Sequence, residues 1–165
     1  MELNLPKGDF KIKNVNNIRS IYDIVRGKYV ALTPEEWVRQ NFVSFLVNSL
    51  GYPMSLIGNE ISLVQNGISR RCDTLVANRN GNPLMIVEYK APHIEITQKV
   101  FDQITRYNYV LHARYIVVSN GMQHYCCRID YENRKITFLP DIPRYDELGN
   151  KKEEDRITFH PLRLL

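Results

Sequence analysis

The sequence has few of the features that mark secreted or membrane-bound proteins. It contains three cysteines in 165 residues, an odd number too small for a disulfide framework, which fits a reducing compartment. It has no run of about 18 apolar residues, as a membrane helix requires. The first segment, MELNLPKGDFKIKN, is too polar for a secretory signal. We therefore expect a cytoplasmic protein without membrane contact.

Two common kinds of site are also missing from the sequence. The histidines are scattered, without the spacing of a metal-binding helix or a catalytic pair: His93, His112, His124 and His160. Cys126 and Cys127 follow His124, but adjacent residues on a strand point to opposite faces and no second ligand pair follows. We therefore interpret these cysteines as strand packing. No Gly-x-x-x-x-Gly-Lys-Ser/Thr loop for nucleotide phosphates occurs.

What is present is an ordinary globular composition with a small positive charge. Apolar residues make up 44% and charged residues 24% of the chain, and 22 basic against 18 acidic residues give a net charge of +4. Such a balance is mildly suited to a polyanionic partner. At this length, and without an internal repeat or linker, we expect one domain over residues 1–165.

The stretch from Arg71 to Lys90 predicts a β-hairpin. Cys72 to Ala77 and Leu84 to Tyr89 are rich in strand-forming residues. Between them, Asn80-Gly81 is typical of a two-residue type I′ turn. If these two residues form the loop, the numbers of facing residues sum to 161, so that Arg79 faces Asn82.

This register also places Asp73 opposite Glu88. Facing side chains point to the same side, with Cβ atoms about 5 Å apart, and Lys90 projects from the same face two residues after Glu88. Facing carboxylates repel each other, and a cation between them reconciles the two. Since oxygen ligands suit Mg²⁺ or Mn²⁺, the hairpin predicts a site for one of these ions.

The remaining signals predict an α/β fold with a mixed central sheet flanked by helices. A capping box of Thr33, Pro34 and Glu36 starts a helix that runs to about Leu50 and stops at Gly51. A second helix over Thr97 to His112 is a crossover, so the strand after it runs parallel to its partner. The further strands expected are 60–64, 114–119, 123–129 and 135–139.

The two ends of the chain are less clearly patterned. Residues 15–25 fit either a helix or a mixture of strand and loop, whereas 10–13 and 28–32 are typical of short strands. We divide the domain into an accessory segment (1–32), a core (33–121), and C-terminal strands with a tail (122–165). The terminal TFHPLRLL is expected to dock as a last short strand.

Asp73, followed after fourteen residues by Glu88-Tyr89-Lys90, resembles the active-site motif of the PD-(D/E)xK nuclease superfamily. TPEEWVRQ before the hairpin, EYKAP within it and the Gln103-x-x-x-Tyr107 element after it extend the likeness. Together they resemble the N-terminal nuclease domain of type I restriction enzyme restriction subunits, over roughly residues 33–121. Two departures are Cys72 in place of the motif proline and the missing ATP-driven motor.

The resemblance implies a restriction-endonuclease-like core and Mg²⁺-dependent hydrolysis of DNA phosphodiester bonds. Asp73 and Glu88 would bind Mg²⁺ or Mn²⁺, aided by the carbonyl of Tyr89, and Lys90 would act on the attacking water. Glu36 is a further candidate catalytic residue, with capping of its helix as the alternative. The candidates for DNA contact are Gln103 and Tyr107, as the resemblance implies, with Arg71 and Arg106, and also Arg70 and Lys99.

The implied partners are DNA and the subunits of a restriction-modification complex, with a homodimer as a further possibility. Two competing functions remain open. One is a catalytically silent module that binds nucleic acid or protein on a nuclease fold, although facing acids repel phosphate. The other is a structural protein that binds metal without affinity for nucleic acid.

Overall fold

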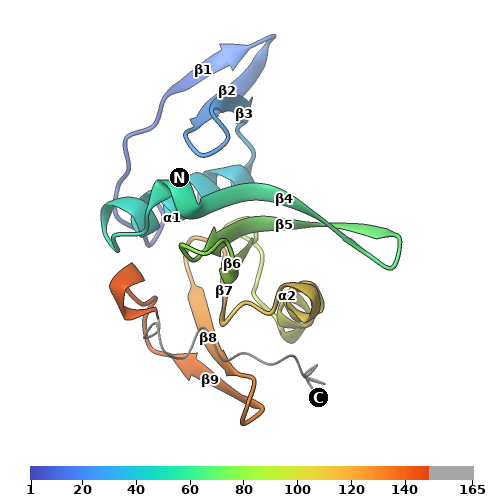
Figure 1. Ribbon diagram of the computed structural model, residues 1–165. Helices are drawn as coiled ribbons and strands as arrows, with labels where there is room; N and C mark the ends of the chain where they lie inside the picture. Colours follow the sequence, from blue (N-terminus) through green and yellow to red (C-terminus); the bar gives the residue numbers. More distant parts are fainter. Residues whose placement is uncertain (149–165) are drawn as a thin grey trace.

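The chain forms two β-sheets with two helices (Figure 1). The computed structural model describes residues 1–148, apart from the side chains of Gln65 and Tyr107. The small sheet has the order β1-β2-β3: Ile12–Val15, Ile18–Asp23 and Lys28–Ala31. The large sheet has the order β4-β5-β6-β7-β8-β9: Ile57–Gln65, Ile68–Ala77, Pro83–Tyr89, Tyr115–Ser119, His124–Asp130 and Lys135–Leu139. The terminal TFHPLRLL lies outside the described residues.

The helices cover opposite faces of the large sheet. α1 (Pro34–Asn48) packs Val38, Phe42 and Leu46 against one face of β6. α2 (Gln98–Leu111) packs Val100 and Ile104 against the other face of β6 and β7. Among the described strands of this sheet, β6 and β7 pair in parallel, on either side of the α2 crossover, and the other neighbours are antiparallel. The predicted mixed sheet flanked by helices is confirmed.

Two short 3₁₀ turns complete the described elements, at Met54–Leu56 and Tyr145–Glu147. Within residues 1–148, neither helix is long and apolar enough to span a bilayer.

The start of α1 only half agrees with the predicted capping box. Thr33 is the N-cap, and its hydroxyl accepts a hydrogen bond from the Glu36 N–H at 3.0 Å. The reciprocal bond is missing from the described contacts because the Glu36 carboxylate accepts from Arg26, Arg39 and Gln40 instead. The Thr33 N–H donates to the Ala31 carbonyl. Glu36 therefore joins a buried charge network and does not close the cap.

The central hairpin has the predicted register but a different turn. Thr74 faces Val87 and Val76 faces Met85, both pairs summing to 161. The prediction of a type I′ turn at Asn80-Gly81 is wrong, as is the pairing of Arg79 with Asn82. The Gly81 N–H donates to the Asn78 carbonyl, the Asn78 N–H donates to the Asn82 carbonyl, and only Gly81 of the loop has a positive φ. The Asn78 side chain holds this loop by accepting from two of its N–H groups.

A β-bulge reconciles the longer loop with the predicted register. The three-residue loop shifts the pairing by one, so that Ala77 faces Pro83, and the extra residue Leu84 restores it at Val76 and Met85. For this reason Leu84 and Met85 pack in the same cluster with α1. Strict alternation along β6 would instead have put Leu84 and Met85 on opposite faces.

Residues 15–25, for which the sequence allows either a helix or a mixture of strand and loop, form strands and turns. Asn16 and Asn17 both have positive φ, at 50° and 64°, and join Val15 to its facing residue Ile18 in a two-residue turn. The left-handed conformation is one that asparagine tolerates, and it suits a tight hairpin. The apolar spacing that resembled a helix comes from two strands of alternating residues.

A buried polar contact joins the small sheet to the large one. Asp23, at the end of β2, is fully buried and accepts from the Arg26 guanidinium and, at 3.1 Å, from the Asn59 amide of β4. It also accepts two backbone N–H bonds in the β2–β3 turn. The small sheet is therefore docked through a carboxylate whose hydrogen bonds offset the cost of burial.

Replacing this carboxylate should loosen the joint between the sheets. We expect Asp23→Ala to lower the free energy of unfolding by about 3 kcal/mol, because it leaves the Arg26 guanidinium and Asn59 amide without their acceptor. Urea denaturation measures the change. The matched control is the exposed Asp9→Ala, for which we expect at most about 0.5 kcal/mol. Equal losses in the two variants would contradict a structural role for Asp23.

Candidate active site

The candidate site lies where the pairing of β5 with β4 is interrupted. The ladder between β4 and β5 omits the pair Glu60 and Asp73, and Glu60 has a positive φ of 57°. Cys72 packs on the α2 side with Leu75, although strict alternation puts residues three apart on opposite faces. The alternation of β5 therefore slips at Asp73. Strained, non-glycine backbone of this kind concentrates at functional sites.

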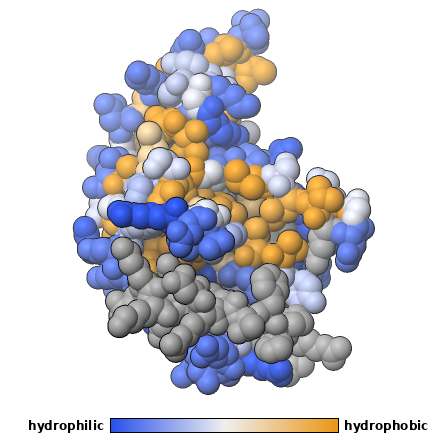
Figure 2. Space-filling view, viewed as in Figure 1, coloured by the Kyte–Doolittle hydropathy of each residue, from blue (hydrophilic) through white to orange (hydrophobic). Residues whose placement is uncertain are grey.

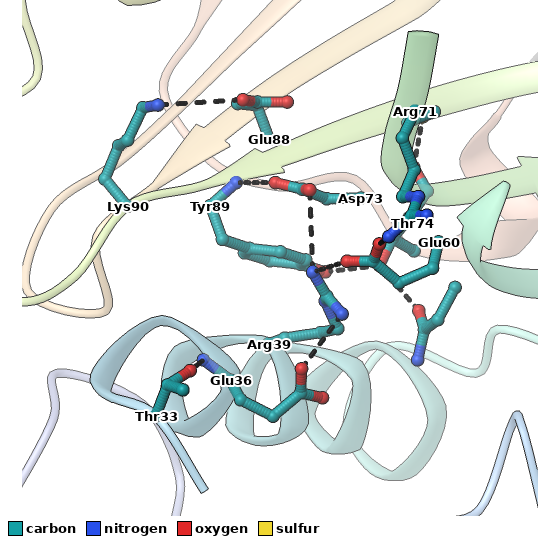
Figure 3. Close-up of polar contacts among 12 residues, drawn as sticks. Thr33, Glu36, Arg39, Glu60, Arg71, Asp73, Thr74, Glu88, Tyr89 and Lys90 are labelled. Atoms are coloured by element: carbon teal, nitrogen blue, oxygen red, sulfur yellow. Dashed lines mark hydrogen bonds and ion pairs between the residues drawn. The ribbon is translucent and has the colours of Figure 1, made fainter. Parts of the chain in front are cut away.

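The slip lets the Asp73 carboxylate lie between its strand and β6. It accepts a hydrogen bond from the Tyr89 N–H at 2.8 Å, so the side chain takes the place of a ladder acceptor. Glu88 points to the α2 side, where its carboxylate accepts from the Gln103 amide at 3.2 Å and lies 3.7 Å from the Lys90 Nζ. In Figure 3, Asp73 lies between Glu88 and Arg39. Strict alternation would instead have put both carboxylates on one face.

Lys90 is fixed by its backbone beside this pair of acids. Its N–H donates to the Ser119 carbonyl at 2.9 Å, which continues the parallel pairing of β6 and β7 by one bond. The side chain remains partly exposed, at 24%, so that the ammonium is accessible from outside. Asp73, Glu88 and Lys90 therefore lie close together, but Asp73 has left the shared face with Glu88 that strict alternation predicts.

Burial makes both carboxylates reluctant to ionise. Burial, together with the negative charge of Asp73, raises the pKa of Glu88 to about 8, against the opposing effect of Lys90. The pKa of Asp73 is also raised by burial, although its bond from Tyr89 and the charge of Arg39 act in the other direction. The nearby positive charges therefore do not fully offset the cost of burying these two acids in their ionised forms.

Arg39 is the cation beneath this site. Its guanidinium, on α1, is 2% exposed and contacts three carboxylates: Glu36 at 3.0 Å, Glu60, and Asp73 at 3.5 Å. Although burial acts in the opposite direction, Arg39 and Arg71 lower the pKa of Glu60. The Arg39 Nε has no partner among the described residues. Arg39 thus links α1 to β4 and β5 at the point where the pairing of these two strands is interrupted.

The two acids in the first turn of α1 have different surroundings. Glu36 is 8% exposed and bonded to Arg26, Arg39 and Gln40. Glu35 is partly exposed, and its pKa is raised by burial and by the charge of Asp73, with Lys90 opposing. Glu35 therefore interacts with the charges of Asp73 and Lys90, whereas Glu36 pairs with Arg39.

The predicted DNA contacts are distributed more widely. Gln103 reaches Glu88, and Arg71, whose side chain is 66% exposed, pairs with Glu60 at 2.9 Å. Arg106 and Lys99 are exposed on α2, and Arg70 is partly buried on β5. The Tyr107 side chain lies outside the described part of the chain. Of these residues, Gln103 and Arg71 have described contacts with acids of the site.

Sequence reasoning missed Glu35, Arg39 and Glu60. Arg39 carried a usable signal, since helical spacing places it one turn after Glu35 and next to the apolar stripe, where an unpaired cation would be costly. Glu60 carried none, because a positive φ within a strand has no signature in this residue type. The buried partners of a charged residue depend on tertiary packing.

A comparison with known families identifies the family of the chain. Residues 34–143 match the family model described as type I restriction enzyme R protein N terminus (HSDR_N). This match spans most of the chain, and the chain therefore belongs to that family. The resemblance drawn from the sequence motifs is confirmed. No curated protein matches the chain.

A solved structure shows the same fold. It is a fragment of a protein described as an HsdR subunit of a type I restriction enzyme from Vibrio vulnificus YJ016, with a TM-score of 0.53 and 22% identity. The match covers 71% of this chain and 24% of that one. The matched part of this chain thus corresponds to about a quarter of that larger fragment.

The raised pKa of Glu88 predicts how stability changes with pH. A carboxyl whose pKa rises from an ordinary value of 4.5 to about 8 on folding binds its proton more tightly in the native state. The free energy of unfolding of the metal-free protein should therefore fall as pH rises from about 4.5 to about 8. Glu60, with a lowered pKa, contributes in a separate acidic window below that range.

Melting temperatures in EDTA across this range provide the measurement. Glu88→Gln mimics the protonated acid, so its melting temperature should fall less between pH 5 and pH 8 than that of the wild type. Parallel profiles for the two proteins would show that Glu88 is not the group that titrates.

Proposed function

We propose that this chain is a metal-dependent endonuclease domain that hydrolyses phosphodiester bonds in DNA. The observation that carries the proposal is a pair of carboxylates, Glu88 buried and Asp73 partly buried, with the Lys90 ammonium at 3.7 Å from Glu88. Membership of a family named for the N terminus of a restriction enzyme subunit supports it. We also propose the other subunits of such an enzyme as partners.

The charges around the site fit a divalent cation. Six carboxylates gather at and around the site through ion pairs or charge interactions: Asp23, Glu35, Glu36, Glu60, Asp73 and Glu88. Four cations lie among them: Arg26, Arg39, Arg71 and Lys90. With all groups ionised, two negative charges are left over, which one divalent ion would neutralise.

The number of protein ligands is also suitable for Mg²⁺ or Mn²⁺. Within residues 1–148 no group of three or more His, Cys, Asp or Glu side chains meets as a metal cluster. Mg²⁺ is commonly held by one or two carboxylates together with water and substrate phosphate. Asp73 and Glu88, with the Tyr89 carbonyl, would supply the protein oxygens.

When bound, the ion would polarise the phosphate and lower the pKa of water. The residues of the chain hold the reacting groups in place. The Tyr89 N–H fixes the Asp73 carboxylate, and Gln103 fixes that of Glu88. Lys90, partly exposed beside them, would orient the attacking water through Nζ. In its neutral amine form it would take the proton of that water as the P–O bond forms, and the resulting ammonium would give a proton to the leaving oxygen. Arg71 would contact a substrate phosphate at the exposed side.

One observation favours a catalytically silent module instead. Arg39 already supplies a positive charge 3.5 Å from Asp73, and an internal cation can take the place of a metal ion. However, Arg39 is shared with Glu36 and Glu60, and Glu88 keeps a strongly raised pKa. The charge of Arg39 therefore does not satisfy both acids of the pair, and we favour the enzyme.

Metal binding should stabilise the fold by relieving the repulsion of these acids. We expect millimolar Mg²⁺ or Mn²⁺ to raise the melting temperature of the wild type by mass action, and to raise that of Asp73→Asn much less. Asp102→Asn, an exposed site on α2, is the matched control and should respond as the wild type does. Equal shifts in all three proteins would place the ion elsewhere.

Catalysis should depend on Lys90 more than metal binding does. In a nicking assay on supercoiled plasmid with Mg²⁺ or Mn²⁺, we expect Lys90→Ala to cut at least about 10²-fold more slowly, as for loss of a positioned proton-transfer group. The shift of melting temperature with metal should persist, because both acids remain.

The control for this assay is Lys135→Ala, an exposed lysine at the start of β9. It should cut as the wild type does. A Lys90→Ala protein with undiminished activity would remove Lys90 from the mechanism. A wild type that binds DNA but never cuts it would favour the silent module.

A further inference from the structure

The outer face of the small N-terminal sheet carries two tyrosines and two lysines. Alternation along β2 turns Ile21 and Asp23, both fully buried, toward the core, so Tyr22 faces outward. Tyr29 faces Tyr22 on β3, and their rings lie 5.1 Å apart in an edge-to-face arrangement. The Lys13 ammonium lies 4.1 Å from the centre of the Tyr29 ring, and that of Lys11 lies 5.9 Å from the Tyr22 ring.

The charge of this sheet is almost entirely positive. Residues 1–32 contain six basic and three acidic residues, so they account for +3 of the net charge of +4. Within strands β1 to β3 the only acid is Asp23, which is buried and paired with Arg26. The exposed charges on these strands are all cations: Lys13, Arg19 and Lys28, with Lys11 just before β1.

From this arrangement we propose that the outer face, defined by Lys11, Lys13, Tyr22 and Tyr29, is a binding surface for single-stranded nucleic acid. Aromatic rings on an open sheet stack on unpaired bases, while nearby cations contact the phosphates. In a duplex the flat faces of the bases are already stacked on one another, which is why the tyrosines favour a single strand. The lysines now cover the rings, and their flexible stems allow the ammonium groups to move to phosphates.

The position of the sheet suits such a partner. It lies beside α1 at the end of the molecule away from β9 (Figure 1), where Figure 2 shows hydrophilic side chains next to hydrophobic ones. Asp23 and Arg26, in the turn after β2, connect directly to Asn59 and Glu36 next to the candidate site. The surface lies outside the family match at 34–143, and its binding does not depend on cleavage.

The test measures binding of the full chain to a fluorescein-labelled oligothymidylate by anisotropy, in EDTA so that no cleavage contributes. We expect Lys11→Glu with Lys13→Glu to weaken binding at least about tenfold and to reduce the salt slope by about 1.4, as for two lost phosphate contacts. Arg128→Glu with Lys135→Glu is the matched control, since it changes the net charge equally at the far edge of the large sheet. It should bind within about twofold of the wild type.

The tyrosines separate stacking from simple charge attraction. Tyr22→Leu with Tyr29→Leu should weaken binding at least about tenfold, whereas Phe at both positions should preserve it. The lysine variants keep both rings, so the surface is tested even where leucine loosens the sheet. Three results would overturn the proposal: equal weakening by the lysine variant and its control, equal binding by the leucine and phenylalanine variants, or equal affinity for the matching duplex.

Discussion

The structure depends on the buried guanidinium of Arg39, which pairs with carboxylates from three elements: α1, β4 and β5. Arg39 comes from α1, Glu60 from β4 and Asp73 from β5, so this contact joins a helix to the irregular point of the sheet. A guanidinium that is 2% exposed is tolerable only because acids surround it, and it offsets part of the cost of burying those acids. The planar fork of an arginine can serve several carboxylates at once, which a lysine ammonium in the same place could not match.

The same network extends into the accessory sheet. Arg26 bridges Asp23 to Glu36, and a chain of hydrogen bonds runs from Asp23 through Asn59 and Thr74 to the Tyr89 hydroxyl. The backbone N–H of that same tyrosine donates to Asp73. The first strands therefore support the geometry of the candidate acids, although they lie outside the matched family region. Buried polar chains of this kind specify one arrangement because each member loses its partner if a neighbour moves.

Local signals in the sequence were sufficient for the sheet and its two helices, and for bringing Asp73, Glu88 and Lys90 together. They failed at two positions where another hydrogen bond competes with the local preference. Asn80-Gly81 has the residues of a type I′ turn, but the Asn78 side chain holds a longer loop by accepting two N–H groups. Glu36 has the residues of a capping box, yet Arg26 and Arg39, brought close by the fold, bind its carboxylate. In the first case a competing local hydrogen bond outweighed the turn preference, and in the second a contact formed by packing outweighed the cap.

The bulge at Leu84 sets a rule for how this hairpin can vary in length. The loop of Arg79 to Gly81 and the bulge each displace the pairing by one residue, and their effects cancel before the strand reaches Glu88. Because side chains alternate with a period of two, loss of either feature alone would exchange the faces of Glu88 and Tyr89, putting a carboxylate into the apolar core beside α1. Single insertions or deletions here would therefore be selected against, whereas changes by an even number of residues would leave Glu88 on its face.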